Sequence, residues 1–401
     1  MVLIKVVFMG AVFVLLSLFA VGQNTNSNLL FPINIDHEFP NPEASFKEVM
    51  ALILDNYYTT DLTEKDLYWA SIQGMLRHIS PPENPELAVV WTPEQYESIL
   101  NSLKGVEVSI GIKSSFNSAD GSLTVTKIIE DSPADGSLLP FDRILRINDL
   151  SLKDKTTPEI NDLLNGEAGT TVKLTVIRDL DILEIELTRQ NLAIKNLEVH
   201  LIPGRKTALI IIRKVTLGIA DELRDELDKL NPIGYTNLIL DLRNNPGGVL
   251  NEGLNIANLF LKRNDIITRT MSRSSQTSPI VSNIDQPMEY NIITLINKQT
   301  ASASEIVVAA LRDHNKATMI GSRTYGKSVI EETFKITNDY HVKFIKSAMY
   351  SPKGNTWQTK GLLPDFLVEQ SNETYLSLSS LHIDDRLRKD LYYITALKLI
   401  D

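Results

Sequence analysis

The sequence predicts a multidomain protein of mixed α/β (α+β) class, and three successive residue patterns indicate it. Apolar residues recur at helical spacing in the first part of the chain, short β-rich runs follow, and strands then alternate with helices. At 401 residues the chain is long enough for two or three domains. We expect a signal peptide at 1–22, a linker and helical cap at 23–104, a β domain at 105–190, and an α/β core with a C-terminal helix at 191–401.

The first residues have the pattern of a secretory signal peptide. The run MVLIKVVFMGAVFVLLSLFAVG has one basic residue, a long apolar stretch, and small residues at 20 and 22 before a polar segment. It is a little short for a spanning helix of about 20 apolar residues. We therefore expect an exported protein, periplasmic or extracellular, that is not inserted in the membrane after cleavage. A retained N-terminal anchor is the alternative.

Composition excludes several kinds of function. With 43% hydrophobic and 22% charged residues the chain is an ordinary globular protein, and its net charge of −10 repels phosphate backbones, so nucleic acid is not an expected partner. The absence of cysteine excludes disulfides, thiolate metal sites and a cysteine nucleophile. No His/Asp/Glu cluster has metal spacing, and no glycine-rich turn continues as a phosphate loop. We expect neither a metal nor a cofactor.

The predicted helical cap rests on apolar spacing at 44–57 and 62–78. The run SPPENP at 80–85 then breaks the chain. A third helix begins at Thr92-Pro93, since proline is favoured at the first helical position.

The β domain is predicted from short runs separated by turn residues. These runs are 107–114, 122–129, 143–147 and 171–178, with a short helix at 157–164. Four of its motifs resemble those of a PDZ domain: VSIGI at 108–112, DSPA at 131–134, DRILRIN at 142–148, and GEAGT at 166–170.

The PDZ resemblance implies peptide binding. A peptide adds to an open sheet edge while backbone N–H groups hold its terminal carboxylate, and the corresponding loop here is Ser109, Ile110, Gly111 and Ile112. The alternative is a small β domain that merely spaces its neighbours.

The α/β core is predicted from strands at 207–212, 238–242 and 292–296 with helices at 219–230 and 250–261 between them. Ligands of parallel sheets gather at the carboxyl ends of the strands. The Gly247-Gly248 turn and Ser302 both follow strand ends. We expect an exposed loop over 263–288, with a flap over the site as the alternative, and one C-terminal helix from about Asp384.

Two readings of Ser302 compete. The spacing Ser302-x-x-Glu305 is a capping box, so the serine could simply cap the helix that follows. However, the N–H of Ala303 at a helix N-terminus suits an oxyanion, and the Gly247-Gly248 turn can aim a second N–H at the same point. Ser302 is therefore a candidate nucleophile.

Lys327 is the candidate base. It follows a glycine in a turn between apolar runs, 25 residues after Ser302. A lysine acts as a base near neutral pH only when burial lowers the pKa of its ammonium group from about 10.4 towards about 7. The alternative is an ordinary turn lysine. A Ser-His-Asp triad is a weaker competitor because the six histidines lie in no recognisable motif.

Three motifs identify a family resemblance: LILDLRNNPGG at 238–248, TASASEIVVAALRDHNKATMIGSRTYGK at 300–327, and SPKGNTWQTKGLLPD at 351–365. They resemble the carboxyl-terminal processing peptidases, or tail-specific proteases, which are Ser-Lys serine endopeptidases with a PDZ domain. The resemblance implies Ser302 as nucleophile and Lys327 as base. It also implies oxyanion donors at Ala303 and in the Gly247-Gly248 turn.

A functionally sensitive family aspartate falls on Asp313. It lies eleven residues after Ser302, or about 16 Å along a helix, so we expect a structural role for it rather than contact with the nucleophile.

The sequence departs from the family at Glu331, where the resemblance implies a glutamine that orients the lysine. If the segment coils, a carboxylate beside Lys327 favours the ammonium form and opposes its use as a base. If the segment is extended, the two residues lie about 13 Å apart and the effect fades. We expect either an enzyme that works with Glu331 protonated or turned outward, or one that is poorly active until rearranged.

A second departure lies near 75–82, where the chain lacks the Leu-Asp-Pro-His-Ser stretch of the family. The helical cap is therefore not expected to dock in the way that is usual in the family.

The sequence thus predicts an exported Ser-Lys endopeptidase that cleaves polypeptides near their C-termini, with the PDZ-like domain binding the substrate C-terminus or gating the site. A homo-oligomer or an adaptor protein stays open as a partner. The alternatives are a catalytically silent peptide-binding protein and a small-ligand carrier on the same fold.

Overall fold

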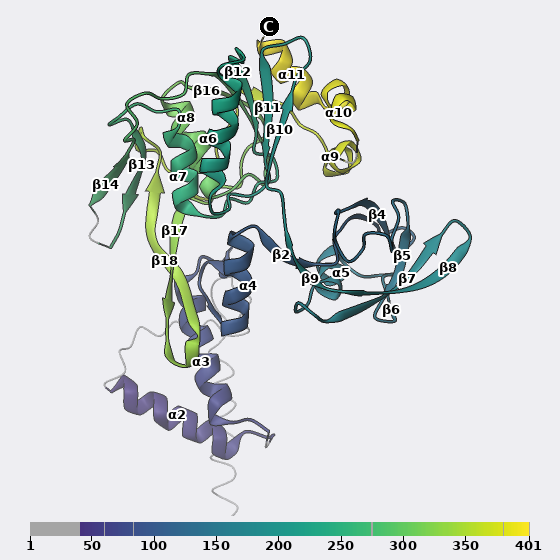
Figure 1. Cartoon of the computed structure of the whole chain (residues 1–401). Coiled ribbons are helices and arrows are strands. Elements are labelled where there is room, and N and C mark those ends of the chain that lie inside the picture. The colour runs from purple at the N-terminus through teal and green to yellow at the C-terminus, as the bar shows by residue number, and fades with distance from the viewer. Residues whose placement is uncertain (1–40, 60, 83, 274–275, 380, 401) are drawn as a thin grey trace, which may run out of the picture. The chain divides into compact units, whose positions relative to one another are not determined.

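The structure is a computed structural model of the chain, and it describes residues 41–59, 61–82, 84–273, 276–379 and 381–400. The predicted signal peptide at 1–22 lies outside the described residues. The chain divides into two compact units, 1–72 and 73–401, which are described separately (Figure 1).

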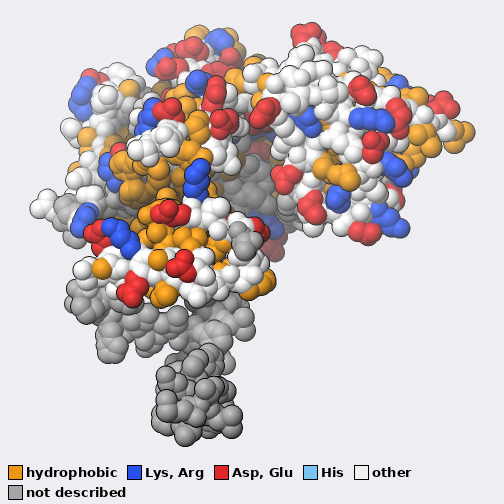
Figure 2. Space-filling view, turned by 90° about the horizontal axis from the view of Figure 1, so that it is seen from below, with side chains coloured by type: hydrophobic (Ala, Val, Ile, Leu, Met, Phe, Trp, Pro, Cys, Tyr) orange, Lys and Arg blue, Asp and Glu red, His pale blue; other side chains and the backbone are white. Residues whose placement is uncertain are grey.

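The first unit contains α2 (Pro42–Asn56) and most of α3 (Glu64–Ile79), which confirms the two predicted helices of the cap. The Asn41 side chain caps α2 by accepting a hydrogen bond from the Ala44 N–H at 3.2 Å. α2 buries none of its residues, and its apolar side chains Phe46, Val49 and Leu52 are exposed. Figure 2 shows hydrophobic side chains in several groups on the face seen from below. No described helix is long and apolar enough to cross a membrane.

The second unit begins with the segment that follows the cap. It contains η1 (Pro85–Leu87), β1 (Val89–Trp91) and α4 (Pro93–Leu103), which starts at the predicted Thr92-Pro93 pair with a capping box to Gln95. β1 pairs antiparallel with β18 (His341–Tyr350), and Asn84 donates a hydrogen bond to the Tyr325 hydroxyl at 2.9 Å. The segment after the missing family motif is therefore anchored by strand pairing.

The β domain is a sheet in the order β3-β4-β5-β7-β8 around its own apolar core, with the short β6 paired to β5. A separate antiparallel pair, β2 with β9, lies at the two ends of this segment of the chain. Its elements are β2 (Val106–Ser109), β3 (Ile112–Asn117), β4 (Ser122–Ile128), β5 (Arg143–Ile147), β6 (Leu150–Ser151), α5 (Thr157–Leu164), β7 (Thr171–Arg178), β8 (Asp181–Thr188) and β9 (Gln190–Ala193).

The prediction of one strand over 107–114 is wrong, because the chain turns at Gly111, whose φ is +87°.

The core is a six-stranded sheet in the order β10-β11-β12-β15-β16-β19. All neighbouring pairs are parallel except β10 with β11, which confirms the predicted largely parallel sheet. The strands are β10 (Leu197–Leu201), β11 (Thr207–Ile212), β12 (Asn237–Asp241), β15 (Asn291–Ile296), β16 (Ala317–Gly321) and β19 (Phe366–Leu367).

Helices cover both faces of this sheet (Figure 1). Because side chains alternate along a strand, Ile210 of β11 joins the larger core with the α6, α7 and α8 residues, whereas Leu209 joins a second core with Tyr393. The helices are α6 (Ile219–Leu230), α7 (Leu250–Asn258), α8 (Ala303–Asp313), α9 (Asn372–Ser379), α10 (Ile383–Lys389) and α11 (Leu391–Ile400).

The single C-terminal helix predicted from about Asp384 is wrong. Asp390 has extended backbone angles and separates α10 from α11. Its carboxylate is buried against Arg243, so a tertiary contact accompanies the break.

The exposed loop predicted over 263–288 is also wrong, since it contains the antiparallel strands β13 (Ile266–Met271) and β14 (Thr277–Val281). They belong to a second sheet in the order β1-β18-β13-β14, in which β17 (Val329–Lys335) also pairs with β18 through a connection that contains η2 (Thr337–Asp339). This sheet carries Glu331, four residues beyond Lys327.

Candidate active site

Two loops meet at the carboxyl ends of neighbouring strands. One follows β12 and carries the Gly247-Gly248 turn, and the other follows β15 and leads to Ser302. Asn244 and Asn297 join them by two hydrogen bonds, from the Asn244 N–H to the Asn297 Oδ1 (2.9 Å) and from the Asn297 Nδ2 to the Asn244 Oδ1 (2.8 Å). The two loops therefore meet at the edge of the sheet where ligands of parallel sheets bind.

Asn245 is a residue that sequence reasoning missed. Its buried side chain donates to the Ile212 carbonyl at 2.8 Å and accepts from the Gly247 N–H at 2.9 Å, while its carbonyl accepts from the Ala301 N–H at 3.0 Å. It therefore fixes the glycine turn against β11 and against the loop of the nucleophile. The only signal in the sequence was its place in the run NNPGG.

The glycine turn lies directly against Ser302. A Cβ on Gly247 would come within 2.9 Å of the Ser302 Cβ, and one on Gly248 within 2.1 Å of the Val215 carbonyl oxygen. Both glycines have positive φ, +88° and +144°, so any side chain there meets both strain and a clash.

The two predicted oxyanion donors of the turn differ. The Gly247 N–H already donates a hydrogen bond to Asn245, so Gly248 is the stronger candidate donor of this turn. Ala303 is the first residue of α8, so its N–H has no carbonyl partner within the helix.

Ser302 has a strained backbone. Its φ of 54° and ψ of −119° lie in a backbone region that residues other than glycine rarely adopt. Holding a residue there costs on the order of 1–3 kcal/mol. The half-buried serine thus stands on a sharp turn between β15 and α8, as the nucleophile does in strand-turn-helix elbows. No described histidine is hydrogen-bonded to it.

Glu305 connects the segments of the two candidate catalytic residues. Its fully buried carboxylate accepts from the Ser302 N–H (2.9 Å) and the Lys327 N–H (2.9 Å), and also from the Gly326 N–H (2.8 Å) and the Thr324 hydroxyl (2.6 Å). Burial raises the pKa of Glu305, and these four donors oppose that rise. The capping box predicted at Ser302 is present, but its glutamate also holds the turn of the lysine.

Both the backbone N–H and the backbone carbonyl of Lys327 are hydrogen-bonded. Besides the contact with Glu305, its carbonyl accepts from the Trp357 indole N–H at 3.2 Å, and Trp357 is buried in the core. In the next residue, the Ser328 N–H donates to the Gln358 Oε1 at 2.7 Å. The third family motif, which contains Trp357 and Gln358, thus fixes the main chain of the base.

The Lys327 ammonium group contacts Glu331, with Nζ and Oε2 2.6 Å apart. The expectation that an extended segment would separate them is wrong. Although Glu331 lies in β17, an irregular register between Ile330 and Glu331 and the length of the lysine side chain bring the charges together. The other carboxylate oxygen of Glu331 contacts the ammonium group of Lys343, on β18.

Asp313 lies at the far end of α8 from Ser302. Its carboxylate is 4% exposed, pairs with Arg312, and accepts a hydrogen bond from the Lys353 N–H at 3.1 Å. These contacts agree with the structural role expected for it.

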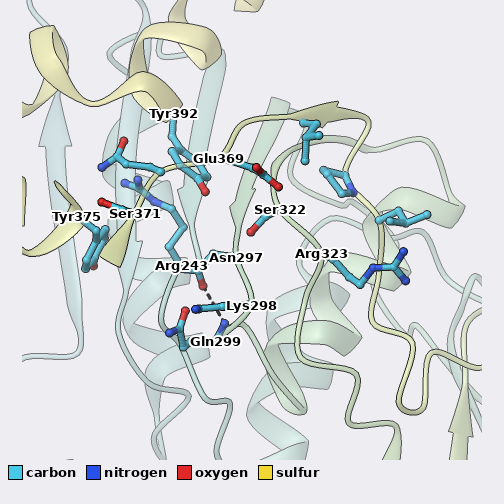
Figure 3. Close-up of a pocket in the computed structure, with 14 residues that line it drawn as sticks. Arg243, Asn297, Lys298, Gln299, Ser322, Arg323, Glu369, Ser371, Tyr375 and Tyr392 are labelled. Carbon is cyan, nitrogen blue, oxygen red and sulfur yellow. Dashed lines mark hydrogen bonds between the residues drawn. The ribbon is translucent and has the colours of Figure 1, made fainter. Parts of the chain in front are cut away.

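A cavity of about 660 Å³ opens at the same strand ends (Figure 3). Asn297, Lys298 and Gln299, which precede Ser302, lie on one side, and Ser322 and Arg323 come from the loop that leads to Lys327. Tyr375 and Tyr392 of the C-terminal helices flank Arg243.

Arg243 belongs to the DLRNNPGG motif and anchors the start of the loop that carries Gly247 and Gly248. It pairs with Asp241 (2.6 Å) and Asp390 (2.9 Å), and the Tyr393 hydroxyl donates to Asp241 at 2.7 Å. Although burial alone would lower it, the carboxylates hold the pKa of Arg243 well above its usual value.

In the β domain, the predicted peptide-binding loop joins β2 to β3. β3 is an edge strand of its sheet, and the Gly111 N–H donates to the Ser109 hydroxyl at 3.0 Å. The Ile110 side chain is buried in the domain core, so this residue can offer a peptide only its backbone. Ile112 begins the edge strand, where a peptide would add.

Comparison with known proteins identifies both domains. Residues 206–368 match the model of peptidase family S41, and residues 108–188 match the PDZ domain. The chain is thus similar to the CtpA-like peptidases of family S41. It is 29% identical over 327 residues to a "Probable CtpA-like serine protease" of Staphylococcus aureus, covering 80% of this chain and 64% of that protein. The relative from Staphylococcus haemolyticus is also 29% identical, with 82% and 65% covered.

Two solved structures share the fold. A photosystem II D1 C-terminal processing protease superposes with a TM-score of 0.52 at 18% identity, covering 86% of this chain and 98% of that one. An S41 protease from Bacteroides fragilis gives a TM-score of 0.61 at 16% identity, with 91% and 98% covered. The chain spans somewhat less than two thirds of the length of the staphylococcal relatives.

Proposed function

We propose that this protein is an exported serine endopeptidase that cleaves polypeptides near their carboxyl termini with a Ser302–Lys327 dyad. The observation that carries the proposal is Glu305, whose one buried carboxylate holds the backbone of both residues. A structural capping box needs only the contact with Ser302. The added contacts with Gly326 and Lys327 support a site built from the two segments together.

In the acylation step, the Ser302 hydroxyl attacks the scissile carbonyl carbon and transfers its proton to neutral Lys327. The carbonyl oxygen becomes an oxyanion that accepts hydrogen bonds from the N–H groups of Ala303 and Gly248. Lys327 then donates the proton to the leaving amine as the C–N bond breaks, and the acyl group stays on Ser302.

In the deacylation step, water attacks the ester and gives a proton to Lys327, which returns it to the Ser302 oxygen as the carboxylic acid leaves. Both steps require an unprotonated Lys327 that turns from Glu331 to Ser302. In the structure the Lys327 Nζ contacts Glu331, so this contact must break before Lys327 can act on Ser302.

Replacing the nucleophile tests this proposal. Ser302→Ala and Lys327→Ala should each lower cleavage of an unstructured polypeptide by at least about 10³-fold, because the dyad acts as a unit. Mass spectrometry of the products reports the cleavage position, and a serine-directed acylating probe should label the wild type but neither variant. Ser278→Ala, an exposed serine of β14, is the matched control and should cleave normally.

Full cleavage by Ser302→Ala would refute the proposal. A wild type that neither cleaves nor reacts with the probe, yet binds peptides, would instead support the catalytically silent alternative.

We propose that the PDZ domain recognises the carboxyl terminus of the substrate through its Ser109–Ile112 loop. The open edge of β3 supports this role. Amidating the terminal carboxylate of the substrate should weaken cleavage mainly by raising KM, and equal KM values for the two substrates would contradict it.

A further inference from the structure

Lys327, Glu331 and Lys343 form a cluster in which one carboxylate lies between two ammonium groups. The three side chains are 22%, 16% and 16% exposed, so solvent screens them only in part. The Lys343 Nζ also lies 5.3 Å from the centre of the Trp91 ring. This cluster surrounds the base that the proposed function requires.

The second sheet brings these residues together. Glu331 pairs with Ile345 across β17 and β18, and Lys343 pairs with Thr333, so Glu331 and Lys343 are diagonal neighbours. On the other side of β18, Val89 of β1 pairs with Lys343, which brings Trp91 near the ammonium group. Lys343 thus has an anion on one side and an aromatic ring on the other.

The charges of the cluster decide which lysine loses its proton more easily. With both lysines protonated, the cluster has a charge of +1. When Lys327 loses its proton, Glu331 and Lys343 remain as a neutral pair, and no unpaired charge is left in a partly buried place. Lys343 keeps its proton because the Trp91 ring adds a cation–π attraction that Lys327 lacks among the described contacts.

The other charged or titratable groups near the cluster do not pair with the Glu331 carboxylate as Lys343 does. The Glu305 carboxylate of α8 accepts a hydrogen bond from the Lys327 backbone N–H and is not paired with the Lys327 ammonium group among the described contacts. The His341 ring on β18 stacks on Tyr96, and Lys346 pairs with Glu332. Among these groups, only Lys343 contacts the carboxylate that holds Lys327.

We propose that Lys343 is a positioning residue that neutralises Glu331 and thereby lets Lys327 lose its proton and act as the base. The Glu331–Lys343 pair then performs, as a neutral unit, the orienting role that the family assigns to a glutamine. This inference rests on the proposed function for its consequence in catalysis, but the charge relation itself can be measured without activity.

The test measures the pH at which Lys327 becomes reactive, by competitive acylation of amines and mass spectrometry of the Lys327 peptide. It uses the Ser302→Ala full-length chain, so that no cleavage interferes. Lys343→Met should move this pH upward by about one to three units, since Glu331 then acts on Lys327 alone. Glu331→Gln should move it downward, because Lys343 becomes an unpaired cation nearby. The double variant Glu331→Gln/Lys343→Met should return close to the parent.

The same changes with Ser302 intact should move the rising limb of the pH dependence of kcat/KM in the same directions. For Lys343→Met we expect activity about 10-fold lower or more at pH 7, with the rate recovered at high pH. Lys346→Met is the matched control on the same strand, and it should leave both profiles unmoved. Thermal melting of each variant verifies that it is folded, and Lys343→Arg, which keeps the charge, should retain the parent profile.

The inference would be overturned if the pH at which Lys327 becomes reactive were unchanged in a folded Lys343→Met protein. It would also be overturned if this pH were raised as far in the double variant as in Lys343→Met alone. If Lys343→Met does not fold, the other two variants decide. A changed pH of Lys327 reactivity in Lys343→Arg, or an unchanged pH in Glu331→Gln, would overturn the inference. Loss of the proposed function is recognised separately, as a wild type without Ser302-dependent cleavage.

Discussion

Two charged clusters of this protein differ in their ratio of cations to carboxylates and in how deeply their side chains are buried. Behind the glycine turn, Arg243 lies between two carboxylates, Asp241 and Asp390, and all three side chains are at most 3% exposed. Beside the candidate base, Glu331 lies between Lys327 and Lys343, which are 22% and 16% exposed. We call the first the closed cluster, because its central guanidinium group is buried from solvent, and the second the open cluster, because the side chains around its central carboxylate are partly exposed.

The comparison teaches how burial and residue type separate structure from chemistry. Arginine does not lose its proton in proteins, so the closed cluster keeps one charge state over the working pH range. Lysine can lose its proton when its neighbours allow it, and the open cluster contains one more lysine than carboxylate. Perturbing the closed cluster should therefore affect stability first, whereas perturbing the open one should affect the pH dependence of catalysis.

The largest effect on stability is expected for Arg243→Met, which leaves Asp241 and Asp390 buried without their partner. We expect the core to lose about 3–5 kcal/mol of unfolding free energy, measured by urea denaturation. Arg263→Met is the control because it breaks an ion pair with Asp285 whose partners are more than half exposed, and its transition should stay at the wild-type position. Equal transitions for Arg243→Met and wild type would remove the distinction between the clusters.

Glu305→Gln should come next, because an amide cannot accept all four of the hydrogen bonds that now reach the carboxylate. We expect kcat to fall about 100-fold through misplacement of Ser302 and Lys327, with a smaller change in KM. The matched control is Glu289→Gln, whose carboxylate pairs with Lys316 at an exposed position. Wild-type kcat in a folded Glu305→Gln protein would show that Glu305 only caps the helix.

The smallest effect is expected in the pH dependence of stability, where two buried carboxylates act with opposite signs. The Arg243 guanidinium and the Tyr393 hydroxyl hold the pKa of Asp241 below 3.8 despite its burial, so its contribution is present above that pH and is lost as the pH falls. Burial raises the pKa of Glu305 above 4.5, so stability falls as the pH rises from 4.5 through the folded value.

Each unit of pKa difference corresponds to about 1.4 kcal/mol. Melting temperatures between about pH 3 and pH 8 should show both slopes in the wild type, with the upper one absent in Glu305→Gln. An upper slope that persists unchanged in this variant would contradict the assignment to Glu305.

Much of the fold was predictable because local patterns agree with it. The strands 143–147, 171–178 and 207–212 and the helices 157–164 and 219–230 were predicted with the bounds that the structure has. The hairpin of β13 and β14 was missed because its polar residues resemble those of a solvated loop, and its stability comes from pairing with β18. The break at Asp390 was missed because apolar spacing continues across it, while the contact that accompanies the break is with Arg243, far away in the sequence.

The sequence by itself determined the family resemblance, the order of the domains, the Ser302 and Lys327 candidates, and the presence of Glu331 where a glutamine is usual. These features depend on local periodicity and on motifs whose spacing is written in the chain. Only the tertiary structure decided that Glu305 joins the segments of the two candidate catalytic residues, that Asn245 accepts a hydrogen bond from the Gly247 N–H, and that Lys343 shares Glu331 with Lys327. The reason is physical: a charge acts through distance and burial, and strand pairing, not sequence proximity, brings Lys343 and Trp91 to the base.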